Sequence, residues 1–473
     1  MSIKTNFLKK NTPMFKFKIE ITLVLVCLLT LVSNAQNKFA TISGEIRNYN
    51  NQPFLVDSKF SVRGEDTIKV KDGKFSTTIS IDNPTTKYIF IGNVLSKIFI
   101  MPGKSLIVNF DLSKEGGDFK YGGDLAVENV ILDSLEKQIL KRTDVFSLPA
   151  EKASLLLDST FTEYKRYLDK TVSVNKVDPS FSECIKAILD YQSAEEKMLC
   201  GFKQQVSDSV YYSFTKEMTI ENEKLLDCHV YKEFLNYYLG YSTDNAVNKL
   251  DSAKRQSKDA YLAENLKLIE QFKNVKVKEY CLFLRVYSDL EHFGVKDFEK
   301  EYDYFKKHNT DTVYAQQIGK LYAKKMALAA GKIAPPFTCK DVNGKEVSLS
   351  DFKGKIVYLD FWATGCGPCR REYPYLVKLQ SEYKDKDKDI VFVSISIDKD
   401  YQEWKKYVIE KKIEGITLIK GLGCDYDVAK AYQISGVPSF KLIDKEGRII
   451  DANAPRPSSS EIRKVLNELL EAK

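Results

Sequence analysis

The spacing of apolar and polar residues divides this chain into three regions with different periods. Residues 36–125 alternate as β-strands do, and two alternating segments flank Asp72-Gly73, a strong hairpin signal. Residues 126–330 change to a helical period, in which an apolar residue recurs at every fourth position in Val127, Ile131, Leu135 and Ile139. From residue 331 onward, strand-like and helix-like segments alternate. The pattern predicts a small β-sandwich, a mostly α-helical region and an α/β domain over 331–473.

The α/β pattern begins after Pro335-Pro336, because two successive prolines cannot continue a helix. Apolar runs predict strands at 356–361, 390–397 and 439–443. Amphipathic spacing predicts helices at 372–383, 401–411 and 461–470.

The N-terminus has the order of a secretory signal peptide. Lys16 and Lys18 precede the apolar stretch 21–32, and small residues then lead to a cleavage site after Ala35. This apolar stretch is shorter than the roughly 20 residues that span a bilayer. We therefore expect residues 1–35 to be a signal peptide, and an exported protein without a transmembrane span after cleavage.

Charge gives no reason to expect nucleic acid or an anionic membrane as a partner. The formal net charge is +7, but five lysines and one glutamate lie in residues 1–36, so the rest of the chain carries only +3.

Export affects how the nine cysteines are interpreted, because disulfides persist in an oxidising compartment. Cys27 leaves with the signal peptide, and Cys366 and Cys369 form the one C-x-x-C motif. Sequence does not choose among the possible pairings of the other six, which are Cys184, Cys200, Cys228, Cys281, Cys339 and Cys424.

The C-x-x-C motif follows a buried-type strand and opens a helix. Unpaired N–H groups and the positive helix end favour a thiolate at Cys366, and Cys369 lies one turn later. A zinc site would need two more ligands at suitable spacing, which the sequence does not supply, and a structural disulfide closing so short a loop would stabilise little. The motif therefore indicates a redox-active disulfide, with no metal or other cofactor.

Residues 331–473 resemble the TlpA/ResA-like thioredoxins of bacterial cell envelopes. The resemblance rests on Phe361-Trp362-Ala363-Thr364, Cys366-Gly367-Pro368-Cys369, Glu372-Tyr373-Pro374 and Gly436-Val437-Pro438. It implies a thioredoxin fold with thiol-disulfide oxidoreductase activity. The two upstream regions are similar to the β and helical extensions that often precede such domains.

The resemblance also implies roles for single residues. Pro438 matches a cis-proline that packs against the active-site disulfide, and the implied substrate-binding residues are Trp362, Gly367, Pro368, Val437 and Pro438. Asp360 matches a buried proton acceptor near the second cysteine. Glu372 matches an acidic residue that tunes thiol acidity or substrate binding, although an acid in a first helical turn also simply favours the helix N-terminus.

One position departs from the family pattern. The family usually has Trp directly before the first cysteine, where this chain has Gly365. The missing indole removes apolar cover beside the nucleophile, which affects substrate selectivity and redox potential rather than the exchange chemistry.

The sequence thus predicts an exported thiol-disulfide oxidoreductase that reduces disulfides of envelope proteins, apocytochromes c among them. A thioredoxin-type Gly-Pro spacer favours the reducing direction, since thioredoxin has a potential of about −270 mV. The implied partners are disulfide-containing envelope proteins and a membrane electron donor. Two alternatives are a binding or scaffolding protein with an accessory thioredoxin domain, and a thiol peroxidase of the peroxiredoxin class, whose Pro and cysteine spacing are missing here.

Overall fold

The computed structural model describes residues 38–56, 67–91, 94–114, 118–141, 144–206, 210–251, 258–296, 298–386, 389–424 and 427–471. The chain folds as two compact units that divide after Cys281. The predicted signal peptide, residues 1–35, and the side chain of Cys424 lie outside the described part. No helix in that part has both the length and the apolar character needed to cross a membrane.

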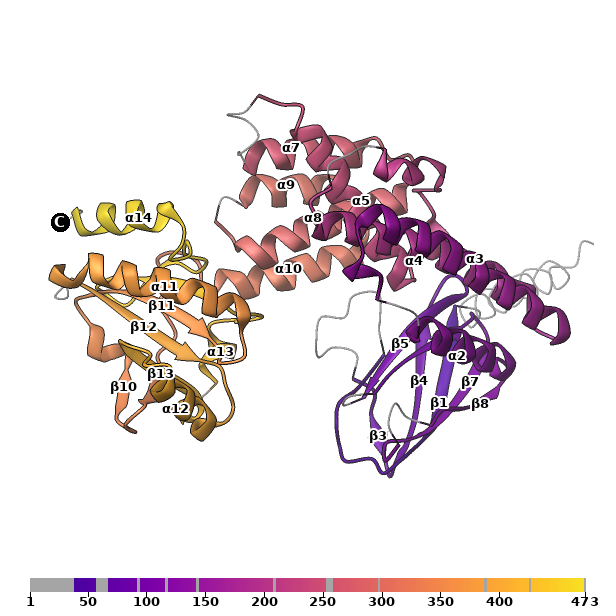
Figure 1. Ribbon diagram of the computed structural model, residues 1–473, viewed down its shortest axis with the longest axis horizontal. Helices are drawn as coiled ribbons and strands as arrows, with labels where there is room; N and C mark the ends of the chain where they lie inside the picture. The colour runs from indigo at the N-terminus through magenta and orange to yellow at the C-terminus, as the bar shows by residue number, and fades with distance from the viewer. Residues whose placement is uncertain are drawn as a thin grey trace, which may run out of the picture. The chain divides into compact units, whose positions relative to one another are not determined.

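The first unit begins with two β-sheets that share one core (Figure 1). Phe54 in the smaller sheet contacts Phe75 and Phe110 in the larger one, with ring centroids 4.8 and 6.0 Å apart. The orders are β3-β4-β1-β7-β8 and β2-β5-β6, with β1 (Phe39–Arg47), β2 (Phe54–Val56), β3 (Val70–Lys71), β4 (Lys74–Ser80), β5 (Thr85–Ile91), β6 (Val94–Ile100), β7 (Ser105–Asp111) and β8 (Lys120–Gly123). The predicted turn Asp72-Gly73 joins β3 to β4, and both residues have positive φ.

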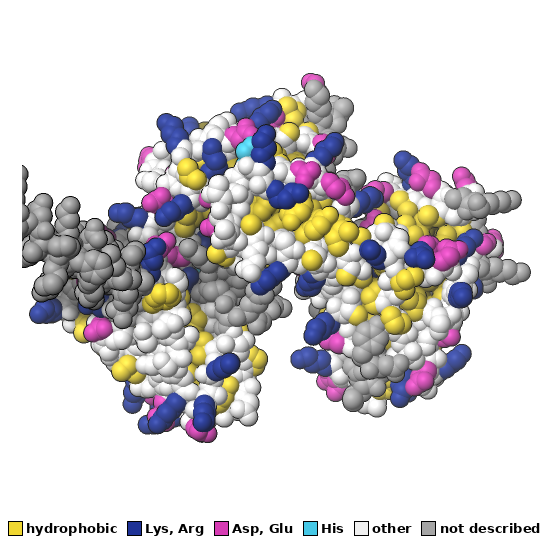
Figure 2. Space-filling view, turned by 180° about the vertical axis from the view of Figure 1, so that it is seen from behind, with side chains coloured by type: hydrophobic (Ala, Val, Ile, Leu, Met, Phe, Trp, Pro, Cys, Tyr) yellow, Lys and Arg dark blue, Asp and Glu magenta, His cyan; other side chains and the backbone are white. Residues whose placement is uncertain are grey.

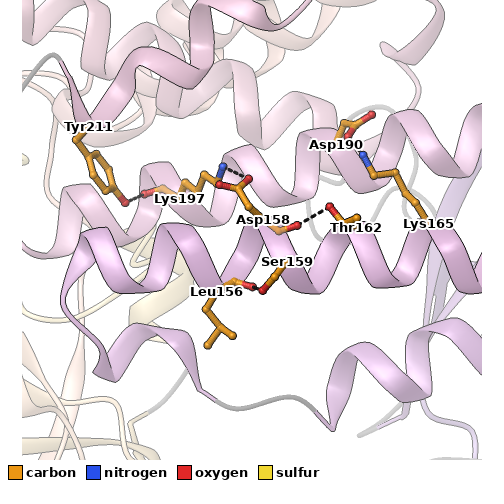
Figure 3. Close-up of polar contacts among 8 residues, drawn as sticks. All are labelled: Leu156, Asp158, Ser159, Thr162, Lys165, Asp190, Lys197 and Tyr211. Atoms are coloured by element: carbon orange, nitrogen blue, oxygen red, sulfur yellow. Dashed lines mark hydrogen bonds and ion pairs between the residues drawn. The ribbon is translucent and has the colours of Figure 1, made fainter.

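Helices follow the sheets, as the period predicts. They are α2 (Ala126–Leu140), α3 (Ala150–Val174), α4 (Pro179–Lys203), α5 (His229–Val247), α7 (Lys258–Glu270) and the first part of α8 (Val275–Phe293). Ion pairs join α3 to α4, one between Lys165 and Asp190 at 2.6 Å and one between Lys197 and Asp158 (Figure 3). The Tyr211 hydroxyl donates to the Lys197 carbonyl at 2.7 Å, which ties the following segment to α4.

One detail of the helical prediction was wrong. In α2, Ile131, Leu135 and Ile139 are buried, but Val127 is 42% exposed. Steps of four residues turn by about 400° at 3.6 residues per turn, so a stripe with that spacing drifts around the helix. The drift carries Val127 off the buried face.

The second unit starts inside α8, continues through α9 (Glu299–His308) and α10 (Thr312–Met326), and ends in a seven-stranded mixed sheet. The sheet order is β10-β9-β13-β12-β11-β14-β15, with β9 (Thr338–Asp341), β10 (Glu346–Ser348), β11 (Ile356–Trp362), β12 (Ile390–Ser396), β13 (Ile416–Cys424), β14 (Ser439–Ile443) and β15 (Ile449–Asp451). The helices are α11 (Gly367–Glu382), α12 (Tyr401–Glu410), α13 (Val428–Ala431) and α14 (Ser460–Glu471).

Buried strand β11 positions the site. Every one of its residues is buried, and it lies between parallel β12 and antiparallel β14. Tyr358 of β11 packs with Leu376 of α11 and Leu466 of α14 on one face of the sheet. Leu359 packs with Val428 of α13 on the other. The thioredoxin-like α/β fold predicted for 331–473 is confirmed.

Charged side chains of both signs occur on one face of the described part of the molecule. On the face shown in Figure 2, Lys and Arg side chains of the described residues are interspersed with Asp and Glu side chains.

Candidate active site

The two cysteines of the C-x-x-C motif lie at the N-terminus of α11. They form a disulfide with an S–S distance of 2.03 Å. The helix begins at Gly367, five residues before the predicted start, so Cys366 is its N-cap and accepts a hydrogen bond from the Cys369 N–H at 3.0 Å. Such N–H groups and the helix dipole favour negative charge on the Cys366 sulfur once the disulfide is reduced.

The two sulfurs differ in exposure. Cys366 is half-buried, whereas Cys369 is only 7% exposed and packs with Trp362, Trp404 and Ile419. Solvent and substrate therefore reach Cys366 first, and Cys369 is protected from intermolecular attack. The geometry suits a nucleophile followed by a resolving thiol.

A cis-peptide loop faces the disulfide. The Val437-Pro438 peptide bond is cis, as the resemblance implies, and the Val437 carbonyl oxygen lies 3.5 Å from Cys366 Sγ. Both residues are half-buried. Exposed Pro368 and half-buried Gly367 occupy the first turn of α11 on the other side of the disulfide. A backbone strand passing over Cys366 would thus meet this loop.

A cavity of about 330 Å³ lies beside Cys369, lined by Asp360, Trp362, Glu372 and Pro438 among others. Asp360 is 8% exposed, and burial raises the pKa of its carboxyl group to about 7. A hydrogen bond from Ser394 Oγ at 3.2 Å lowers this pKa in part, and the nearby Glu372 raises it. A carboxyl group with a pKa near neutrality can exchange protons with a buried thiol at physiological pH.

Glu372 is held in place by the loop before α14. Its carboxylate accepts hydrogen bonds from the Ser458 N–H at 3.1 Å and hydroxyl at 2.9 Å, and Arg456 lies 3.8 Å away. The structure thus places this acid in the same cavity as Asp360 and Cys369. Because α11 begins at Gly367, Glu372 lies in the second turn of the helix and not in the first, so the alternative of a first-turn acid that favours the helix N-terminus was wrong.

The loop that precedes Cys366 depends on a carboxylate that sequence analysis missed. Asp398 accepts hydrogen bonds from the Thr364 N–H and hydroxyl, both at 2.9 Å, and a further one from Ser396. Gly365 is exposed, and a Cβ there would meet nothing within 4 Å. Packing therefore does not require glycine at this position, and the disulfide has no indole cover on this side.

The remaining cysteines are far less accessible. Cys184, Cys200, Cys228 and Cys281 are buried, and burial raises the pKa of the Cys184 and Cys281 thiols well above the ordinary range. Cys339 is disulfide-bonded. In the ladder between β9 and β13, its Cα lies opposite the Cα of Cys424. The described residues contain no group of three His, Cys, Asp or Glu side chains placed to hold a metal ion.

Three further residues of the site were also missed by sequence analysis: Ser394 lines the cavity, and Arg456 and Ser458 contact Glu372. Ser394 lies in a strand that the apolar pattern predicts, but a serine there has no distinctive signal. Arg456 and Ser458 reach the site from a loop about 85 residues after Glu372 in the chain. Only the fold brings these groups together.

Comparisons with known proteins match the C-terminal part of the chain. A family model described as Redoxin matches residues 329–469. Thiol-disulfide oxidoreductase ResA of Bacillus subtilis (strain 168) is 33% identical over 149 residues, which cover 31% of this chain and 79% of that protein. ResA of Geobacillus kaustophilus (strain HTA426) is 36% identical over 130 residues, which cover 27% of this chain and 71% of that protein. The crystal structure of the thioredoxin domain of a thiol-disulfide oxidoreductase from Bacteroides vulgatus is 35% identical, covers 30% of this chain and 97% of that domain, and has a TM-score of 0.26.

Proposed function

This chain belongs to the TlpA/ResA-like family of thiol-disulfide oxidoreductases, and we propose that it is exported and reduces disulfide bonds of cell-envelope proteins through Cys366 and Cys369. The proposal rests on the asymmetry of the pair. Half-buried Cys366 caps a helix beside the Val437-Pro438 loop, and buried Cys369 shares a cavity with Asp360.

The first step is attack by the reduced Cys366 thiolate on one sulfur of a substrate disulfide. A bond forms between Cys366 Sγ and that sulfur, and the substrate S–S bond breaks. The second substrate sulfur leaves as a thiolate and takes a proton from solvent. Val437 and Pro438 would bind the extended substrate backbone, with Trp362, Gly367 and Pro368 forming the rest of the contact surface.

The second step releases the substrate. Asp360 accepts the Cys369 proton, and the Cys369 thiolate attacks Cys366 Sγ. The mixed disulfide breaks, the substrate sulfur that was bonded to Cys366 leaves as a thiolate and takes a proton from solvent, and the Cys366–Cys369 disulfide of the structure remains. Glu372 adjusts the ionisation of Asp360 through its nearby charge. Two electrons from a membrane dithiol donor then return the pair to the reduced state, so no bound cofactor is needed.

The direction and the setting are part of the proposal. The Gly-Pro spacer favours reduction of substrates, with apocytochromes c among the candidate envelope proteins. The signal-like order of residues 1–35 supports export to the envelope. N-terminal sequencing of the mature protein from the envelope fraction should begin at Gln36, and a cytoplasmic protein that retains residues 1–35 would contradict export.

Trapping the mixed disulfide tests the reaction. In cells, a Cys369→Ser variant should accumulate protein adducts that dithiothreitol releases, because the resolving step is blocked. A variant that also carries Cys366→Ser should accumulate none, and a Cys281→Ser control should behave as the unmodified chain does. Absence of adducts with Cys369→Ser, or full retention of every measured activity by Cys366→Ser, would refute the reductase function.

A further inference from the structure

A second cavity of the C-terminal unit continues from the cis-proline loop. We call it the β14 groove. It has a volume of about 850 Å³ and shares Pro438 and Phe440 with the active-site cavity. One wall is formed by the ends of α8 and α10, and the other by β14 and β15. A polypeptide bound over Cys366 and Pro438 can therefore extend into this groove.

Hydrogen bonds hold the helical wall against the sheet. The Gly331 N–H donates to the Ile449 carbonyl at 2.8 Å, and the Ile449 N–H donates to the Lys332 carbonyl at 2.7 Å. The Gln433 side-chain amide donates to the Lys324 carbonyl at the end of α10. These contacts belong to one compact unit, so the groove is a built feature of the fold.

A buried lysine lines this groove. Lys441 is only 4% exposed, and its ammonium group donates a hydrogen bond to Ser439 Oγ at 2.9 Å. Among the described residues, no carboxylate forms an ion pair with it. Burial lowers the pKa of Lys441 to about 8, with a further contribution from the neighbouring Lys325 and partial compensation from Asp451. An ammonium group has three donors, so this one retains donor capacity for an incoming acceptor.

Two of the three acidic side chains that line the groove have cationic partners. Glu291 on α8 pairs with Lys325 on α10 at 3.2 Å, and Asp451 on β15 pairs with Lys296 at 3.7 Å. His292, Glu299, Tyr432 and Arg456 complete the titratable and charged lining. Among the lysines and arginines that line the groove, Lys441 thus has no carboxylate partner and is also the most buried.

We propose that the β14 groove binds an acidic, extended segment of the substrate protein next to its disulfide, and that Lys441 donates a hydrogen bond to a carboxylate of this segment. The inference rests on the proposed reductase function. It follows from the position of the groove beside Pro438 and from the cost of burying a cation without an anionic partner. A charge-assisted hydrogen bond with substrate would offset that cost.

The test compares two synthetic peptides on the reduced full-length chain. Both contain the same intramolecular disulfide, flanked on each side by Asp-Glu-Asp in one peptide and Asn-Gln-Asn in the other. Stopped-flow tryptophan fluorescence follows oxidation of the Cys366–Cys369 pair, because both tryptophans of the chain, Trp362 and Trp404, pack with Cys369. The measured quantity is the ratio of second-order rate constants, acidic over neutral.

With the unmodified chain, the acidic peptide should react about ten times faster than the neutral one, as expected for a hydrogen bond to a charged group. Lys441→Met should bring this ratio close to one, whereas Lys441→Arg should keep most of it. Lys464→Met on α14, which removes a lysine that is 76% exposed, is the matched control and should leave the ratio unchanged. Tryptophan fluorescence of the oxidised variants, which should match that of the unmodified chain, shows that they are folded.

The pH dependence gives an independent readout. The ratio should fall as pH rises through about 8, where Lys441 loses its proton, and Lys441→Arg should remove this fall. Ionisation of the attacking thiol affects both peptides equally and cancels. A ratio near one for the unmodified chain, or an unchanged ratio in Lys441→Met, would overturn the groove assignment. Failure to react with either peptide would instead refute the reductase function.

Discussion

Replacement of Asp360 by Asn should stabilise the C-terminal domain and at the same time slow its chemistry. The carboxyl group is 8% exposed and lies in the cavity beside Cys369. Asn keeps the shape and can still contact Ser394 Oγ, but it neither carries a charge nor accepts the Cys369 proton. One substitution therefore tests the electrostatic cost and the proposed catalytic use of the same group.

The size of the stability effect follows from the pKa of Asp360. In the folded protein this pKa is about 7, against an ordinary value of 3.8. A group with a raised pKa binds more protons when folded, so its ionisation costs folding stability as pH rises between these two values. At about 1.36 kcal/mol for each pH unit, the cost reaches about 4 kcal/mol above pH 7 and vanishes below about pH 4. Asp360→Asn should remove this cost and raise the free energy of unfolding by the same amount.

The assay must report on the C-terminal domain within the full chain. The only two tryptophans pack beside Cys369, so their fluorescence during denaturant unfolding serves this purpose. The stability difference between Asp360→Asn and the oxidised unmodified protein should grow steadily from pH 4 to pH 7 and then stay constant. Glu468→Gln on α14, whose side chain is 63% exposed, should show no such trend.

The same substitution that stabilises the domain should slow the reaction. Without a proton acceptor for Cys369, release of the mixed disulfide should slow by about a hundredfold, the lower range for a general base. Gel analysis of quenched reactions would show the adduct accumulating. A stability difference that is flat with pH would refute the buried-carboxylate reasoning, and unchanged release would remove Asp360 from the reaction.

Further predictions concern the loop before Cys366 and the core of the N-terminal unit. Gly365→Trp should leave the free energy of unfolding within about 0.5 kcal/mol, because a Cβ there meets nothing, while it slows alkylation of reduced Cys366 several-fold. Asp398→Ala leaves the Thr364 N–H and hydroxyl without their acceptor, and should cost about 1–3 kcal/mol by fluorescence-monitored unfolding and slow exchange with every substrate. Glu136→Gln removes the ionic partner of Lys97, whose side chain is 3% exposed, and should destabilise the N-terminal unit by about 3 kcal/mol in circular-dichroism unfolding.

The parts of the site that sequence could predict are local ones. Cys366, Cys369 and the strand before them are adjacent in the chain, so their spacing alone indicates a thiol pair at a strand-to-helix junction. The cis peptide before Pro438 required the family resemblance, because most such bonds are trans. The predicted start of α11 was late because Gly367 and Pro368 are poor helix interior residues, although Pro is favoured in a first turn.

The parts that sequence could not predict depend on contacts between distant segments. Strands β10 and β15 have three residues each, too short for a period to be visible. Asp398 and Ser458 contact the site through loops whose positions only the folded sheet sets. Lys441 lies in a predicted strand, where a lysine usually indicates an exposed position, but it is only 4% exposed and lines the same groove as the end of α10.

Strand pairing separates the two functional groups of the C-terminal domain. Across the β11–β14 ladder, Asp360 is paired with Phe440 and Leu359 with Lys441. Paired residues project to the same face, so Asp360 and Lys441 project to opposite faces of the sheet. Proton transfer at Cys369 and recognition of an acidic segment should therefore be energetically independent. In the double variant Asp360→Asn/Lys441→Met, the loss in release rate and the loss in peptide discrimination should each equal the single-variant value, because effects without shared partners add. Coupling between the two losses would show that substrate in the β14 groove also controls the protonation of the resolving thiol.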